Sequence, residues 1–324
     1  MDKAKFLVRQ LAQVWSKNQN RRGRLLVMGV MLFITAGLLF WLVYRQREIL
    51  LAYQWQFRPW PILLSFVFYS FALFQTGLIW YQIISALGNR LGFAKNFRYF
   101  CITNLGKRLP GSVWYIPWRA KIYQEQGLSL RSVSIASGIE LVVLMISGAI
   151  ISLLFALPSF GLIGQNWPGM ALMLAIMLVF LHPAVIRKLG SLFHVSTDEV
   201  QYRQILQWVG LYLLFWLVSG CMLFFVVNIF IPLELIHLPY VIGSWSLAGV
   251  LSMSLLLLPS NFGMTEISIS LLLSRVIPSS VAVVVAIGSR ILLLLYEIAW
   301  AGLAFWLESR DQRRTKPSEE PKSE

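Results

Sequence analysis

Seven long apolar runs divide the chain and restrict the folds open to it. Each run is long enough to cross the roughly 30 Å hydrocarbon core of a bilayer at about 1.5 Å per helical residue. Only 13% of the 324 residues are charged, whereas about a quarter are charged in soluble domains. We therefore expect an all-α polytopic membrane protein. The runs are Leu25–Tyr44, Trp60–Leu87, Ser132–Leu157, Pro168–Ile186, Ile205–Ile231, Leu238–Leu258 and Pro278–Leu307.

The positions of the basic residues predict the orientation. The net charge is +14, and Lys and Arg gather before the first run, between the second and third runs, and after the last. The connections at 158–167 and 232–237 carry neither residue. This asymmetry follows the positive-inside rule and argues against a nucleic-acid partner. We expect both termini in the cytoplasm and the chain in the inner (plasma) membrane. The predicted parts are a basic segment (1–24), a transmembrane domain (25–308) and a disordered tail (309–324).

Seven crossings would leave the two termini on opposite sides, although the basic tail favours the cytoplasm. The segment Gly263–Val276 supplies a further, partial crossing. Its length, about 14 residues, is below the roughly 20 that a helix needs to span a bilayer. It would therefore cross as a half-helix completed by irregular backbone, which is tolerated at membrane depth only inside protein or beside a watery cavity. The expected total is about seven to eight transmembrane helices.

Two segments broken by Gly and Pro share one layout. In the first, NLGKRLPGSVWYIPWR at residues 104–119 ends at Arg119 and is followed by a turn and a helix carrying Glu140. In the second, the break at Pro259 is followed by Glu266, a turn and a helix carrying Arg290. The order of the charges is reversed. Paired interrupted segments indicate a transporter-like site near the membrane midplane. Either an inverted repeat or coincidence explains the likeness.

The two motifs resemble those of the lysylphosphatidylglycerol synthase transmembrane family, also called flippase-like domain proteins. The resemblance covers about residues 25 to 308. It departs at Ser260, Asn261 and Phe262, where the family is usually richer in Gly. The aminoacyl-transferase domain fused to some members does not follow Leu307, so the resemblance implies the lipid-handling membrane half and not lipid synthesis. The matching residues are Asn104, Gly106, Lys107, Pro110, Gly111, Trp114, Arg119, Gly127, Ser129 and Glu140, then Pro259, Gly263, Glu266, Arg290 and Glu297.

The first broken segment is the candidate site for a lipid phosphate. Lys107 and Arg108 stand between Gly106 and Gly111, and glycines let backbone N–H groups approach an anion. The alternative is that these two charges only set topology. Arg119 suits either a bidentate phosphate contact or an ion pair with a carboxylate.

The aromatic residues of the same segment have two interpretations. Trp114, Tyr115 and Trp118 belong either to an interfacial belt or to the wall of an acyl-chain or isoprenoid groove. Apolar residues recur at helical spacing from Phe93 to Leu105, with basic residues between them. This pattern predicts an interfacial amphipathic helix that leads into the break.

Four charged residues lie in apolar surroundings and need a partner or a cavity. They are Glu140, Glu266, Arg290 and Glu297. An intramembrane charge costs at least about 2.5 kcal/mol by insertion scales. The four form either structural ion pairs, with Arg290 bridging Glu266 or Glu140, or a polar track for a lipid head group or a coupled proton.

We therefore expect a lipid flippase or scramblase-like protein for an anionic phospholipid or a polyprenyl-phosphate-linked lipid. The alternative is a non-transporting lipid-binding subunit of a membrane complex that modifies lipids or glycans. A membrane enzyme or a second copy of the chain is the expected protein partner. The sequence has no catalytic, nucleotide-binding or metal-ligand motif, so no enzyme activity, cofactor or metal is expected. A membrane-embedded glycosyl- or acyltransferase is disfavoured because no extended loop is large enough to hold a sugar-nucleotide site.

Overall fold

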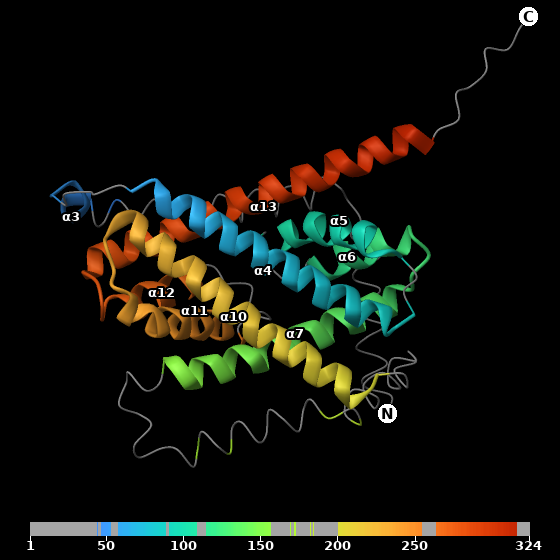
Figure 1. The fold of residues 1–324 in the computed structure, drawn as a ribbon, viewed down its shortest axis with the longest axis horizontal. Helices are drawn as coiled ribbons and strands as arrows, with labels where there is room; N and C mark the ends of the chain where they lie inside the picture. Colours follow the sequence, from blue (N-terminus) through green and yellow to red (C-terminus); the bar gives the residue numbers. More distant parts are fainter. Residues whose placement is uncertain are drawn as a thin grey trace, which may run out of the picture. The chain divides into compact units, whose positions relative to one another are not determined.

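The computed structural model describes residue 44, residues 47–52, 58–88, 91–108, 115–156, 200–254 and 264–315, and isolated positions between 169 and 184. The chain divides into Met1–Arg45 and Gln46–Glu324. All helices described below belong to the second unit, and Figure 1 shows how they are arranged. The described residues are helical, with turns between the helices and no strand.

Five described segments are long and apolar enough to cross a membrane. They are α4 (Trp60–Ser85), α7 (Leu130–Phe155), α10 (Tyr202–Phe230), η4 with α11 (Leu235–Ser254) and α13 (Ser279–Thr315). Five of the seven predicted runs are thus confirmed as long helices. The run Leu25–Tyr44, apart from Tyr44, and most of Pro168–Ile186 lie outside the described residues. The five helices support a multi-pass membrane protein.

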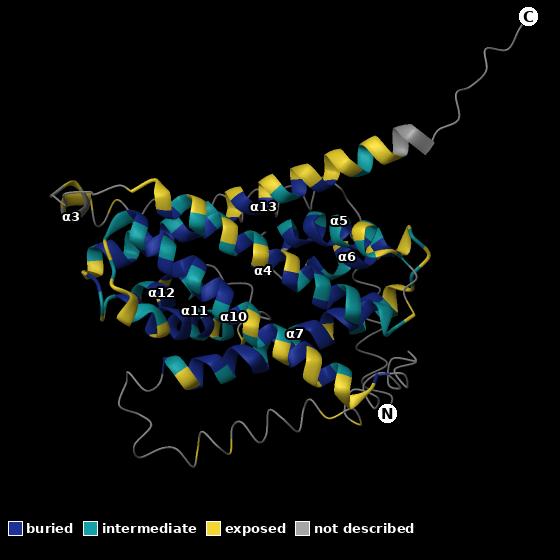
Figure 2. Ribbon diagram, in the orientation of Figure 1, coloured by how far each residue is buried: buried dark blue, intermediate teal, exposed yellow. Residues whose placement is uncertain are grey.

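The outward side of α4 shows why these helices belong in a membrane. Its exposed residues are large and apolar and recur every three or four positions, so they form one stripe along the helix (Figure 2). Contact between such a stripe and water is unfavourable, whereas contact with lipid tails carries no such cost. The stripe consists of Trp60, Leu63, Val67, Phe71 and Phe74.

Shorter helices connect the spans. They are α3 (Arg47–Ala52), α5 (Phe93–Asn104), the 3-10 turn η1 (Leu105–Arg108), α6 (Tyr115–Gln124) and α12 (Met264–Leu273). With 10 residues each, α6 and α12 are about 15 Å long, half the thickness of the hydrocarbon core. The half-helix predicted within Gly263–Val276 is therefore present as α12.

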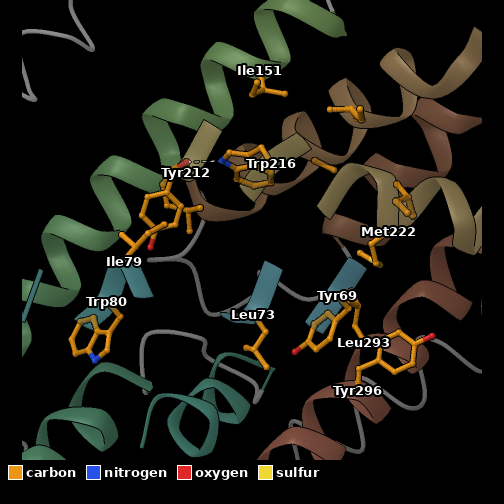
Figure 3. Close-up of a cluster of buried hydrophobic side chains, with 14 of the residues drawn as sticks. Tyr69, Leu73, Ile79, Trp80, Ile151, Tyr212, Trp216, Met222, Leu293 and Tyr296 are labelled. Carbon is orange, nitrogen blue, oxygen red and sulfur yellow. Dashed lines mark hydrogen bonds between the residues drawn. The ribbon is translucent and has the colours of Figure 1, made fainter. Parts of the chain in front are cut away.

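Helices α4 and α10 run antiparallel through the core, so the start of α4 lies at the end of α10. There the backbone N–H of Arg58 donates to the carbonyl of Ile229 at 3.0 Å, and further along Gln75 Nε2 donates to the carbonyl of Leu211 at 2.7 Å. Figure 3 shows Tyr212 and Trp216 of α10 on the side of α7, and the indole of Trp216 donates to the carbonyl of Leu144 at 3.0 Å.

Glycines allow α10 and α11 to approach closely. A Cβ at Gly220 of α10 would lie 2.6 Å from the Cα of Ile242 of α11. A Cβ at Gly148 of α7 would lie 2.8 Å from the ring of Trp216. Small residues at helix crossings bring backbones together, which favours packing between membrane helices that have no water to exclude.

The helix contacts define two ends of the second unit. At the α3 end, α4, α11 and α13 begin while α7, α10 and α12 finish, and Tyr240 Oη of α11 donates to the carbonyl of Leu272 of α12 at 2.7 Å. At the α5 end, α5 packs against α13, where Arg98 contacts Asp311 at 2.6 Å and Glu308 at 3.2 Å. Helix α13 thus runs from the α3 end to the α5 end.

Helix α13 is longer than its apolar run. It continues to Thr315 and has 37 residues, about 55 Å, so it outreaches a bilayer core. The prediction of a disordered tail from residue 309 is therefore wrong for 309–315. The contacts of Glu308 and Asp311 with Arg98 support the extension, and Tyr99 Oη donates to Glu308 at 3.2 Å. Residues 316–324 lie outside the described residues.

Candidate functional site: two ion-paired helical hairpins

Each half-helix forms a hairpin with the long helix that follows it. In the first hairpin, α6 reaches the α5 end, the chain turns at residues 125–129, and α7 returns. Gly127 has φ +86°, a left-handed conformation that favours glycine, and Ser129 caps α7 by accepting from the N–H of Ser132 at 3.0 Å. In the second hairpin, α12 reaches the α3 end, turns at 274–278 and continues as α13. The two turns therefore lie at opposite ends (Figure 1).

A buried ion pair joins the two arms of the first hairpin. Nη1 of Arg119 on α6 lies 2.5 Å from Oε2 of Glu140 on α7. The two side chains are 0% and 2% exposed. Either charge, if it were buried without the other, would strongly destabilise the protein.

Aromatic rings enclose the Arg119 guanidinium. It lies 4.1 Å from the Trp80 ring centroid and 5.1 Å from those of Phe100 and Tyr115. Its Nε donates to Thr103 Oγ1 at 3.3 Å, while Nη2 is buried without a hydrogen-bond partner. Ring faces attract cations, so the enclosure stabilises a charge that water does not reach.

The charge of Glu140 keeps Arg119 ionised. Helix α6 lies outside the five candidate spans. Burial is the largest single effect on the pKa of Arg119 and lowers it, but the carboxylate of Glu140, its hydrogen bond, and the nearby Tyr115 and Tyr123 together raise the pKa above its ordinary value. Burial, with a smaller contribution from Glu140, raises the pKa of Tyr115 well above its usual range. Tyr115 therefore remains a neutral ring beside the cation.

A second ion pair joins the arms of the other hairpin. Nη1 of Arg290 on α13 contacts Oε1 of Glu266 in the first turn of α12. Glu266 is 5% exposed, whereas Arg290 is 22% exposed, so solvent or lipid reaches this pair. The other oxygen, Oε2 of Glu266, is buried without a hydrogen-bond partner. Of the two partners considered for Arg290 from sequence, the structure selects Glu266.

The two hairpins share more than their outline. Their paired residues are separated by 21 and 24 positions. In the first the half-helix supplies the Arg and the long helix the Glu, and in the second these roles are exchanged. The arrangement agrees with the reversed charge order of the sequence and with the opposite directions of the two half-helices.

The remaining candidate residues fall into two groups. Gly106 is buried against α6, and a Cβ there would lie 2.7 Å from the Trp118 ring, so this glycine serves helix packing. Tyr115 is buried against Arg119, and Trp118 is partly exposed. Glu297 is buried on α13, two turns beyond Arg290. Gly111, Trp114 and the side chains of Lys107 and Arg108 lie outside the described residues, although the backbone of the last two belongs to η1.

Several residues of the first site were not identified from the sequence. Trp80 Nε1 donates to Tyr123 Oη at 2.7 Å, and Tyr123 Oη donates to Asn96 Oδ1 at 2.5 Å. This network joins α4, α6 and α5 next to Arg119. The sequence signal for this network is Asn96, a polar residue within an amphipathic helix. A buried amide needs a hydrogen-bond partner, so its presence indicates a polar contact with a neighbouring helix.

Comparison of the chain with protein-family models found no match, and no curated protein matches it. Among the described residues, no group of three or more His, Cys, Asp or Glu side chains could hold a metal ion.

Proposed function

We propose that the chain is a membrane protein that binds and translocates a lipid carrying an anionic phosphate, either an anionic phospholipid or a polyprenyl-phosphate-linked lipid. The observation that supports this proposal best is the pair of opposed half-helix hairpins, each tied by an Arg–Glu pair, of which the first is fully buried and the second partly buried. Transporters use discontinuous helices of this kind near the midplane, where half-helix ends and polar groups meet a substrate.

In this proposal the two ion pairs have different roles. Arg119 is enclosed and already neutralised, so it is a positioning residue that holds α6 against α7. The more accessible Glu266–Arg290 pair belongs to the polar track along which a head group moves. Glu140 and Glu297 are the other acidic residues that the sequence places in apolar runs.

The lipid phosphate would first meet the basic residues of η1. The backbone of Lys107 and Arg108 lies at the end of α5, next to α6 and α13. Helices α5 and α13, which contact η1, carry further Lys and Arg residues, and each charge near a membrane surface attracts anionic lipid by about 1 kcal/mol. This position joins the membrane surface at the α5 end to the first hairpin.

Lipid co-purification tests the binding step. The wild-type protein should carry one anionic or polyprenyl-phosphate lipid above its bulk abundance, as measured by quantitative mass spectrometry. Lys107→Ala/Arg108→Ala should remove the enrichment. Lys121→Ala/Arg131→Ala is the matched control, because it removes the same charge from exposed residues of α6 and α7 at the same end. Equal enrichment in all three proteins would contradict a phosphate site at η1.

A translocating protein and a lipid-binding subunit differ in one result. Vesicles that contain only this protein should move the enriched lipid between leaflets. Binding without movement would favour the subunit that presents lipid to a partner enzyme.

A further inference from the structure

A second basic and apolar site lies at the α3 end, away from η1. A cavity of about 530 Å³ opens between the start of α4 and the end of α10. Its volume falls within the roughly 300–1,000 Å³ typical of small-molecule sites. Leu64, Phe224 and Phe225 form apolar walls, and Arg58 and Trp60 also line it.

Arg58 is the charged residue of this lining. It is exposed, and no ion pair joins it to a carboxylate among the residues that the structure describes. Asn228, the other polar side chain, is already used: Nδ2 donates to the carbonyl of Phe224 at 2.9 Å, and Oδ1 accepts from the N–H of Leu233 at 3.1 Å. Glu234 is exposed and does not line the cavity. The cavity therefore offers one cation above an apolar floor.

Two contacts hold α4 and α10 together beside the cavity. The backbone N–H of Arg58 donates to the carbonyl of Ile229 at 3.0 Å, which fixes the start of α4 against α10. The rings of Phe68 and Phe225 stack across the two helices with centroids 5.3 Å apart. The walls are thus preformed, so a ligand would not have to order them on binding.

The position and the charge of the cavity indicate which ligand it binds. The cavity lies at the start of one candidate span and the end of another, and the ends of helices that cross a bilayer lie at the level of the lipid head groups. Trp60 is exposed beside Arg58, and both residue types favour this interface. We propose that the cavity binds an anionic phospholipid of the leaflet at the α3 end, with the phosphate at Arg58 and an acyl chain along Leu64, Phe224 and Phe225.

This site requires only that the protein is embedded in a bilayer. It does not depend on translocation, and adduct formation needs no transport. Failure of this inference and failure of the proposed function are therefore separate results. If both proposals hold, the protein has a basic site for an anionic lipid at each end of the spans.

Photo-crosslinking with mapping tests the site. The full chain is reconstituted in phosphatidylcholine vesicles with a phosphatidylglycerol probe that carries a diazirine in one acyl chain. Adducts should map to peptides that contain residues 58–64 and 224–233. Excess unlabelled phosphatidylglycerol should compete them away, and excess phosphatidylcholine should not. A charge-assisted contact predicts a loss of about ten-fold or more in adduct yield for Arg58→Ala.

Two further variants separate binding from folding. Leu64→Trp keeps Arg58 but fills the cavity, so it should also remove the adducts. Arg203→Ala removes an exposed Arg at the opposite end of α10 and should leave them unchanged. Unchanged adducts in Arg58→Ala and Leu64→Trp, equal competition by phosphatidylcholine, or mapping to other helices alone would overturn the inference.

Discussion

Nη1 of Arg119 and Oε2 of Glu140 lie 2.5 Å apart, and water reaches almost none of either side chain. The contact joins a helix too short to cross a membrane to one that is long enough. It fixes the position of α6 along the axis of α7, because Arg119 can reach Glu140 from only one position along that helix. The opposite ion pair does the same for α12 and α13.

Removing one partner of the enclosed pair should destabilise the protein strongly. Arg119→Ala leaves Glu140 buried without its cation, and such losses cost about 3–5 kcal/mol. The apolar double variant Arg119→Met/Glu140→Leu should lose much less, because no charge remains buried. Thermal unfolding of the purified protein measures both, with Arg131→Ala on the exposed start of α7 as control. A double variant as unstable as Arg119→Ala would contradict this account.

The Glu266–Arg290 contact should appear as an energetic coupling. A double-mutant cycle with Glu266→Ala and Arg290→Ala should give about 0.5–3 kcal/mol of interaction energy, as for residues in direct contact. Arg290 is partly exposed, so solvent screening should make Arg290→Ala less costly than Arg119→Ala. Strict additivity of the two single variants would show that the contact carries no stability.

Helix packing at Gly220 should not tolerate a side chain. Gly220→Ala places a Cβ 2.6 Å from the Cα of Ile242, so α10 and α11 must separate and the melting temperature should fall. Gly210→Ala on the same helix meets no atom within 4 Å and should be neutral or stabilising by up to about 1 kcal/mol. Equal melting temperatures for the two variants would contradict the close crossing.

The two hairpin turns should be labelled from opposite sides of the membrane. In a Cys221→Ala background, a membrane-impermeant thiol reagent should reach Gln124→Cys from one side and Ser279→Cys from the other. The native Cys101 should not react, because it is buried and burial raises its pKa to about 12. Labelling of both positions from the same side would exclude opposed hairpins.

The long helices could be predicted from the sequence because their apolar runs exceed the thickness of a bilayer. The half-helix at α12 followed from the basic tail and the parity of crossings. The length of an apolar run and the charge of a segment each depend on many residues, so one atypical residue changes neither prediction. The end of α13 was missed because Glu308 and Asp311 gain their helix-supporting contact from Arg98, far away in the sequence.

The site was predictable in its charges but not in its contacts. The Arg and Glu residues of the two pairs are recognisable in the sequence as charges in apolar surroundings, but the sequence leaves Glu140 and Glu266 as alternative partners for Arg290. The full enclosure of Arg119 by Trp80 and Phe100 depends on how α4, α5 and α6 meet, which no local pattern specifies. The sequence predicts that Gly106 lets an anion approach the backbone, and the structure shows that the absence of a side chain at this position makes room for Trp118.

Transport of lipid by the isolated protein is the most direct test of the central claim. Vesicles are reconstituted with the protein and a fluorescent phosphatidylglycerol or polyprenyl-phosphate lipid, and a membrane-impermeant reductant then reports the fraction exposed outside. The account predicts loss of fluorescence beyond the outer-leaflet fraction for wild type and Lys121→Ala/Arg131→Ala, and a much slower loss for Lys107→Ala/Arg108→Ala. Fluorescence loss limited to the outer leaflet in wild-type vesicles, for both lipids, would contradict it.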